Sequence, residues 1–184
     1  MHYSICDFLL DIIQNGIESG AGNIDVILEE DAVWFSALVQ DDGRGMTAMQ
    51  IERALDPFFT DGTKHPGRKV GLGLPFLKQA TDSLGGSLDI HSEKGKGTGI
   101  AFRLPMDNID TPPLGDLVGT LVQAFTFIDA YELSVSRKKP DGDAYRVTRS
   151  ELADALGELD TVGSQSLLRN YIESLEENHG ENDA

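Results

Sequence analysis

The chain has 184 residues, 40% of them hydrophobic and 25% charged, which is the composition of a globular protein long enough to bury a core. Its formal net charge is −16, from 31 acidic and 15 basic residues, and its densest basic run is Arg137-Lys138-Lys139; we therefore expect it to bind neither nucleic acid nor a membrane surface, because an acidic surface repels their phosphates. A single cysteine, Cys6, excludes an intrachain disulfide. We see no signal peptide and no run of ~18 apolar residues that would form a transmembrane helix, so we expect a cytoplasmic protein.

Apolar spacing predicts three helices and four strands in the first part of the chain. Residues 3–19 have helical periodicity, with the apolar side chains on one face. Thr47 can cap a second helix that runs to about residue 55, and a pair of glycines can end a third helix over 72–84. Strands are predicted over 24–28, 33–39, 87–92 and 99–104, and a loop over 56–70.

The second part of the chain is predicted to begin at residues 110–113, where the sequence Asp-Thr-Pro-Pro interrupts any regular element. Beyond it we expect a helix at about 114–127, a hairpin that pairs 131–136 with 144–148, and two helices, of which the last covers 164–177. We therefore predict a first domain over residues 1–109, a small appendage of order αββαα over 110–178, and a disordered tail over 179–184.

The first candidate site is the pair Asp11 and Asn15 on the predicted N-terminal helix. Their i, i+4 spacing places both side chains on one face of that helix. The amide oxygen of Asn15 is a hard, neutral ligand suited to Mg2+, which takes its other ligands from phosphates and water. The carboxylate of Asp11, one turn earlier, can orient or deprotonate a water beside the metal. A carboxylate and an amide on a helix are more often simply solvated, and here the apolar opposite face and the following Gly-rich turn favour a site.

A second candidate site lies in residues 39–46, Val-Gln-Asp-Asp-Gly-Arg-Gly-Met. The carboxylate of Asp41, at the end of a predicted strand, accepts hydrogen bonds only and can receive the exocyclic amine of adenine. Gly43 and Gly45 allow the backbone leading to Met46 to pass close to the base. A calcium-like or plain surface turn is the alternative for this segment.

Two further glycine-containing turns complete the set of candidates. The first opens a predicted helix, whose free N–H groups and dipole can bind phosphate; it contains Lys69, Gly71, Leu72, Gly73 and Leu74. The segment before it, 58–68, has the composition of a lid, and neither a Walker A loop nor a Rossmann fingerprint matches. In the second turn, 95–98, Thr98 can bond the adenine-side carboxylate or its bridging water, and a simple hairpin turn is the alternative.

Together, and in this order, these segments resemble the GHKL superfamily of gyrase, the ninety-kilodalton heat-shock chaperone, histidine kinases and MutL. Residues 10–21 look like its N-box, 41–46 like the G1 box, 56–60 like the F-box, 71–74 like the G2 box and 97–98 like the G3 element. The resemblance implies an α+β fold of the Bergerat type, a two-layer α/β sandwich whose mixed sheet is covered by helices on one face. It also implies that ATP and Mg2+ bind, with Asn15 on the metal, Asp41 on the adenine amine, and Gly71 and Gly73 with Lys69 near the phosphates.

Three functions are open for such a domain. The first is an ATPase or ATP-dependent switch that acts on a partner protein; members resembling MutL use Glu at the position of Asp11, so the shorter Asp predicts slow or absent turnover. The second is a kinase, similar to histidine kinases or anti-sigma factors, that phosphorylates a partner in trans, because only ten residues precede Asp11 and we expect no phosphoacceptor hairpin. The third is a non-catalytic ATP-binding interaction module, to which residues 111–184 are suited. The oligomeric state stays open.

Overall fold

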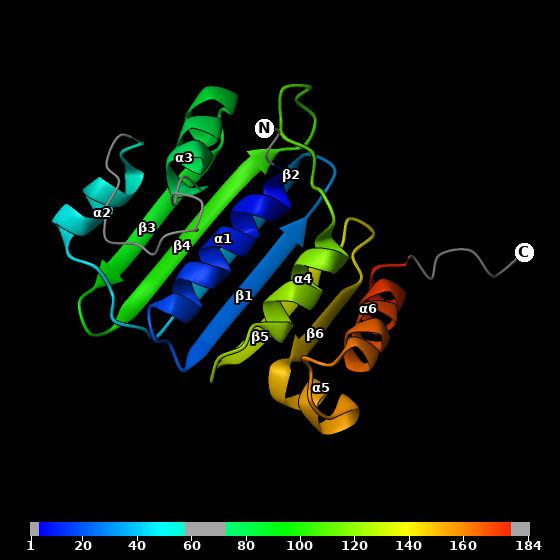
Figure 1. The fold of residues 1–184 in the computed structure, drawn as a ribbon. Coiled ribbons are helices and arrows are strands. Elements are labelled where there is room, and N and C mark those ends of the chain that lie inside the picture. Colours follow the sequence, from blue (N-terminus) through cyan, green and yellow to red (C-terminus); the bar gives the residue numbers. More distant parts are fainter. Residues whose placement is uncertain (1–3, 58–72, 178–184) are drawn as a thin grey trace, which may run out of the picture.

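The computed structural model describes residues 4–57 and 73–177, which form one mixed sheet with helices against it (Figure 1). The strands are β1 (Asn23–Glu30), β2 (Trp34–Asp41), β3 (Ser87–Glu93), β4 (Gly97–Pro105), β5 (Glu132–Lys138) and β6 (Ala144–Thr148). The helices are α1 (Ile5–Glu18), α2 (Ala48–Leu55), α3 (Gly73–Leu84), α4 (Leu117–Thr126), α5 (Arg149–Leu156) and α6 (Val162–Glu176). None of these helices is both long and apolar enough to cross a membrane.

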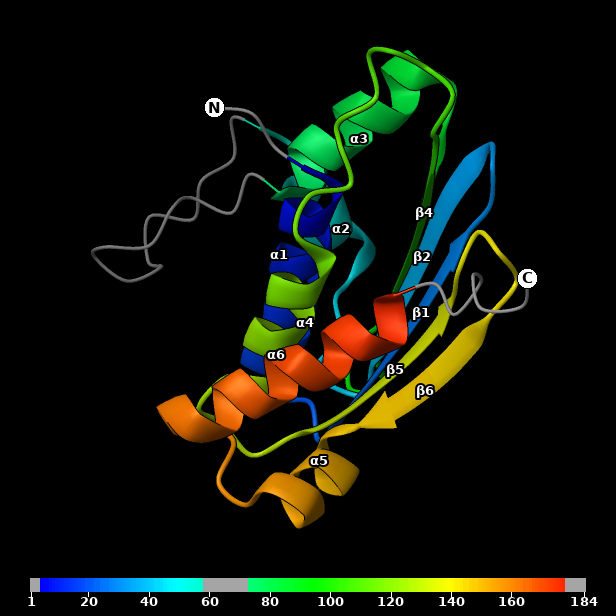
Figure 2. The same ribbon diagram turned by 90° about the vertical axis from the view of Figure 1, so that its right-hand side faces the viewer.

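The strands lie in a single sheet in the order β3-β4-β2-β1-β5-β6. Neighbouring strands are antiparallel except for β1 and β5, which run parallel. Seen along its edge, the sheet has α1, α3, α4 and α6 on the same side (Figure 2). The predicted α+β fold, a mixed sheet covered by helices on one face, is therefore confirmed.

The residue pattern of the strands explains why the helices gather on one face. In β1 the buried residues Ile24, Val26 and Leu28 alternate with exposed ones, and in β2 buried residues alternate mainly with half-buried ones. Because successive side chains of a strand point to opposite faces, this alternation makes one face of the sheet apolar. Burying that face against amphipathic helices removes its side chains from water, which is the main stabilising contribution to folding.

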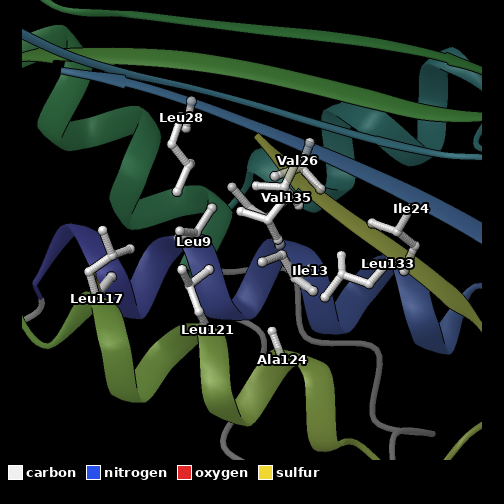
Figure 3. Packing of buried hydrophobic residues seen from close by; sticks show 14 of the residues in the cluster. Leu9, Ile13, Ile24, Val26, Leu28, Leu117, Leu121, Ala124, Leu133 and Val135 are labelled. Carbon is white, nitrogen blue, oxygen red and sulfur yellow. The ribbon is translucent and has the colours of Figure 1, made fainter. Parts of the chain in front are cut away.

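Helix α1 lies at the centre of the core, between the sheet and α4. Its side chains Leu9 and Ile13 are completely buried and lie between Val26 of the sheet and Leu121 of α4 (Figure 3). The helix begins at Ser4, whose side chain caps it in a reciprocal capping box. α1 is thus held on two sides, and its polar residues are restricted to the remaining strip of its surface.

The C-terminal segment continues the sheet and the core of the N-terminal one. Its elements occur in the predicted order α4-β5-β6-α5-α6, and β5 pairs with β1 in a register that places Val135 beside Val26. The N–H groups of Ile5 and Cys6 at the start of α1 also donate to carbonyls of residues 113 and 114 at 2.9 Å. Because the segments share one sheet and one core here, their division into two domains at residue 109 stays a prediction.

A buried ionic cluster attaches α6 to the sheet. Arg137 is 3% exposed, and its guanidinium forms ion pairs with Glu30 of β1 and, at 3.4 Å, with Glu176 of α6. Lys139 is also buried, and its ammonium donates to the carbonyl oxygen of Glu177 at 3.3 Å. Two of the three cations of the basic run are therefore paired inside the protein.

Leu121→Ala should lower the free energy of unfolding by about 2–5 kcal/mol, because shortening a buried leucine loses apolar contact and leaves a cavity. Leu121 is 0% exposed, whereas Val162 on α6 is 86% exposed, so Val162→Ala should change stability by less than about 0.5 kcal/mol. Urea unfolding followed by circular dichroism measures both variants. Unchanged stability of Leu121→Ala would contradict the placement of α4 in the shared core.

Candidate functional site

Two polar side chains of α1 lie beside its buried face. Eight of the fourteen residues of α1 are buried, whereas Asp11 and Asn15 are half-buried. The side-chain amide of Asn15 donates a hydrogen bond to Oδ2 of Asp11 at 3.3 Å. This bond uses the nitrogen of Asn15 and leaves its oxygen, a hard neutral ligand, for a cation. The pair therefore fits a magnesium ligand with a neighbouring carboxylate.

Helix α3 begins directly against Asp11. A Cβ at Gly73 would stand 2.2 Å from Oδ2 of Asp11, so only glycine fits there without displacing that side chain. The first residues of a helix have N–H groups without a partner inside the helix, and the helix dipole adds partial positive charge. Gly73 and Leu74 thus place beside Asp11 a helix end whose N–H groups can bind an anion. The other residues predicted for this turn lie outside the described ranges: Lys69, Gly71 and Leu72.

A second group of site residues centres on Asp41 at the end of β2. Its carboxylate is half-buried, and Oδ1 accepts hydrogen bonds from the backbone N–H of Gly43 at 2.8 Å and from the hydroxyl of Ser19 at 3.3 Å. Burial raises the pKa of Asp41 above its usual value, although these two hydrogen bonds and one from the backbone of Thr98 act in the opposite direction. The charged carboxylate is thus poorly solvated, and a hydrogen bond from a ligand is worth more there than in water.

Two turns pack tightly on each other beside Asp41. Gly45 and Gly97 have φ values of +62° and +105°, which favour glycine. A Cβ at Gly45 would stand 2.0 Å from the carbonyl oxygen of Glu93, and one at Gly97 would stand 1.9 Å from the carbonyl oxygen of Asp41. The two glycines therefore allow the turn after β2 to contact the β3–β4 turn, backbone against backbone.

The hydroxyl of Ser92 joins the same two turns. It accepts a hydrogen bond from the N–H of Met46 at 2.7 Å and donates one to the carbonyl oxygen of Gly97 at 3.0 Å. The hydroxyl of Thr98 lies 2.8 Å from it. Because Ser92 has one proton and gives it to Gly97, Thr98 is the donor in this contact. The side chain of Thr98 is thus bonded to Ser92, while its backbone, opposite Asp41 in the sheet, contacts the carboxylate.

Helix α1 connects the two groups of residues. Gly16 follows Asn15, and a Cβ at Gly16 would stand 3.4 Å from Cβ of Asp41, so the helix passes directly beside this carboxylate. An acceptor-only carboxylate at one end, and an amide oxygen with a helix N-terminus at the other, can together hold a purine nucleotide with a metal-bound phosphate chain. The described residues that the structure brings together are Asp11, Asn15, Asp41, Gly43, Gly45, Met46, Gly73, Leu74 and Thr98.

Two serines that no sequence pattern predicts also belong to this site. Ser19 contacts a residue 22 positions away, and Ser92 contacts one 46 positions away. A single serine at a helix end or in a strand is common, and nothing in its neighbours indicates such distant partners. The position of Ser19 just before a glycine indicates a helix end, and this is the only local signal for either residue.

Comparison with known proteins adds a family and several relatives. Residues 4–108, more than half of the chain, match the family described as "Histidine kinase-, DNA gyrase B-, and HSP90-like ATPase". The chain is 33% identical over 101 residues to sensor histidine kinase DcuS of Escherichia coli (strain K12), a match that covers 53% of this chain and 18% of DcuS. It is 31% identical over 97 residues to sensor histidine kinase YxdK of Bacillus subtilis (strain 168), with 50% of this chain and 29% of YxdK covered.

A solved structure also resembles part of this chain. The catalytic domain of histidine kinase ThkA, in a nucleotide-free form, has 25% sequence identity and a TM-score of 0.41, with 53% of this chain and 63% of that chain covered. The chain spans less than a third of the length of the curated relatives DcuS and YxdK.

Asp41→Asn should raise the midpoint of thermal unfolding at pH 7 in the absence of nucleotide. The pKa of Asp41 is higher in the folded than in the unfolded chain, so the folded state loses stability as the pH rises from about 4 through the raised pKa. The uncharged amide avoids this loss, and its advantage should shrink as the pH falls toward 4. Calorimetric scans between pH 4 and pH 8 measure the difference.

The adjacent Asp42 provides the opposite control. Hydrogen bonds from the side chain and backbone of Asn23 lower the pKa of Asp42, so its charged form stabilises the folded state above pH 4 and this contribution disappears in acid. Asp42→Asn should therefore lower the unfolding midpoint at pH 7. Shifts of the same sign in both variants would contradict the environment assigned to Asp41.

Proposed function

Because this chain belongs to the histidine kinase-, DNA gyrase B- and HSP90-like ATPase family and carries its ATP-binding domain, we propose that it binds Mg-ATP as a switch for a partner protein and hydrolyses ATP slowly. The observation that carries this proposal is the placement of Asp11, Asn15 and Asp41 along α1, with the start of α3 at Gly73. Along α1, Asp41 supplies the proposed adenine acceptor, Asn15 supplies the proposed metal ligand, and the start of α3 supplies the proposed phosphate-binding helix end.

The adenine end of the site is Asp41. Its carboxylate receives the exocyclic amine, and because the acceptor is ionised this hydrogen bond is charge-assisted and contributes about 1.5–3 kcal/mol. Thr98 supports the carboxylate through its backbone. Gly43, Gly45 and Met46 form the turn that lies along the base, and Ser92 holds this turn against the β3–β4 turn.

The phosphate end is formed by Asn15 and the start of α3. The amide oxygen of Asn15 is the protein ligand of Mg2+, which neutralises phosphate charge when it is bound. The N–H groups at Gly73 and Leu74 bind phosphate oxygens, and the role of Lys69, Gly71 and Leu72 near the phosphates, outside the described ranges, stays a prediction from the sequence. Support for this end comes from the contact between Gly73 and Asp11, which brings α3 to the metal ligand.

Asp11 is the base for hydrolysis in this proposal. It accepts a proton from the water whose oxygen bonds to the γ-phosphorus, while the bond from that phosphorus to the β–γ bridging oxygen breaks and ADP leaves. An aspartate reaches one methylene less far than a glutamate. Gly73 also lies against its carboxylate, which limits the positions it can take, so we expect the proton transfer to be slow.

The switch function rests on the contact between α1 and the C-terminal segment. Leu9 and Ile13 of α1, on the turns that carry Asp11 and Asn15, pack against Leu121 of α4 (Figure 3). A shift of α1 on nucleotide binding must therefore be accommodated by α4, because a close-packed core does not deform continuously. The partner-facing surface is proposed to lie in this segment, residues 110–178.

Transfer of the γ-phosphoryl group to a partner in trans is the second candidate function. It is favoured by the relatives DcuS and YxdK, both named sensor histidine kinases. A nitrogen of a partner histidine then replaces water as the group that bonds to the γ-phosphorus.

Incubation with γ-labelled ATP separates the candidates: free labelled phosphate indicates an ATPase, a labelled partner indicates a kinase, and neither indicates a non-catalytic binding module.

Asn15→Ala should remove the Mg-dependent part of the stabilisation by ATP, because it deletes the only protein ligand proposed for the metal. Thermal unfolding with ATP, in the presence of Mg2+ or of a chelator, measures that part. Asn170→Ala, on the exposed face of α6, is the matched control and should behave as wild type. Equal Mg-dependent shifts in Asn15→Ala and wild type would rule out the metal role.

Asp11→Glu should speed steady-state hydrolysis by about tenfold or more, since a well-placed general base contributes about 10²–10⁴ to a rate. The added methylene brings the carboxylate closer to the attacking water. Asp154→Glu, exposed on α5, is the control for an added methylene elsewhere. A rate for Asp11→Glu at or below that of wild type would refute the idea that short reach limits turnover.

A further inference from the structure

We propose that Ser19 is the positioning residue for Asp41: its hydroxyl fixes the orientation of the carboxylate and thereby determines selectivity for a 6-amino purine over a 6-oxo purine. This inference rests on the proposed role of Asp41 in adenine binding. It adds a residue from the end of α1, in a part of the chain where no sequence pattern predicts a contact with the base.

Ser19 is held firmly by its backbone. It caps the C-terminal end of α1 with a helical backbone conformation, and its N–H donates to the carbonyl oxygen of Asn15 at 2.9 Å. Its own carbonyl oxygen accepts a hydrogen bond from the N–H of Arg44, in the turn after Asp41, at 3.2 Å. Ser19 therefore links the helix that carries the proposed metal ligand to the turn that carries the proposed adenine acceptor.

The hydroxyl of Ser19 lies between two acceptors. Its one proton is shared as a bifurcated donor between the carbonyl oxygen of Gly16, 2.7 Å from the hydroxyl oxygen, and Oδ1 of Asp41, 3.3 Å from it. A Cβ at Gly43 would stand 1.6 Å from this hydroxyl oxygen, so the hydroxyl occupies the space that a side chain at position 43 would need. The glycine at position 43 thus serves the contact between Ser19 and Asp41.

These contacts favour one orientation of the carboxylate. Two of the donors to this carboxylate, the N–H of Gly43 and the hydroxyl of Ser19, contact the same oxygen, Oδ1. Oδ2 lies on the side of Gly16, 3.7 Å from the point where a Cβ of that residue would stand. With Oδ1 held by the protein, Oδ2 is the oxygen that receives a ligand amine.

A fixed acceptor discriminates between purines through the group at position 6. Adenine carries an amine there, which donates a hydrogen bond to the carboxylate. Hypoxanthine and guanine carry a carbonyl oxygen instead, which is itself an acceptor and forms no hydrogen bond with the carboxylate. Without the Ser19 hydroxyl the carboxylate of Asp41 can rotate. Binding of the amine must then order this side chain, and the lost side-chain entropy weakens the binding of ATP. Loss of Ser19 should therefore weaken binding of ATP and leave binding of inosine triphosphate unchanged.

The test is titration calorimetry of the full chain with Mg-ATP and with Mg-inosine triphosphate. Ser19→Ala should lower the affinity for ATP by about tenfold, which corresponds to about 1.4 kcal/mol, with no change for inosine triphosphate. Ser83→Ala is the matched control, because the Ser83 hydroxyl also donates to carbonyl oxygens of its own helix, at 2.8 Å for Gln79, and is exposed. Its affinity for both nucleotides should equal that of wild type.

The affinity for Mg-ATP divided by the affinity for Mg-inosine triphosphate separates a positioning role of Ser19 from a general loosening of the site. This ratio should be lower in Ser19→Ala than in wild type. A ratio for Ser19→Ala equal to that of wild type, with both nucleotides bound normally or both weakened, overturns the proposal. Ser19→Gly removes the same hydroxyl, and the lower ratio must recur in it; a wild-type ratio there also overturns the proposal.

Asp41→Asn distinguishes failure of this inference from failure of the proposed function. If Asp41→Asn lowers the ratio and the Ser19 variants do not, the adenine role of Asp41 stands and the role of Ser19 is wrong. If wild type does not bind Mg-ATP, or Asp41→Asn binds both nucleotides as wild type does, the proposed function itself is wrong.

Discussion

The burial of α1 between the sheet and α4 is the constraint on which the site depends. Eight of the fourteen residues of α1 are buried, so its polar side chains share one narrow strip. Asp11, Asn15 and Ser19 follow each other at intervals of four residues along that strip and span roughly 12 Å of helix. The strip joins the start of α3 at one end to Asp41 at the other. A helix held on two sides by apolar packing keeps these distances constant.

The proposed adenine end of the site combines tight packing with an unfavourable charge. The backbones around Gly45 and Gly97 come so close that no side chain fits, and Ser92 joins the two turns. In this rigid surround Asp41 is partly buried, and burial raises its pKa. An ionised carboxylate in that place costs folding free energy, which the proposed hydrogen bond from a ligand amine would offset. The same desolvation thus lowers stability and strengthens recognition.

The C-terminal segment belongs to the same packed body as the nucleotide-binding part. β5 extends the sheet from β1, α4 covers α1, and the ion pairs of Arg137 attach α6. Removing one partner of a buried ion pair leaves an uncompensated charge, so this cluster makes detachment of α6 costly. A signal that starts at α1 therefore has a direct structural route to the C-terminal helices, which supports their proposed role as the partner-facing part.

The order of the elements, the buried face of α1 and the candidate residues Asp11, Asn15 and Asp41 follow from the sequence alone, because they depend on spacing within one helix or strand and on short capping and glycine patterns. Three-dimensional packing, in contrast, makes the C-terminal segment continue the sheet, buries Arg137 and Lys139, and brings Ser19 and Ser92 to the site. Their contacts join residues 22 and 46 positions apart. Such contacts depend on how elements pack, and no local pattern of side chains encodes that packing.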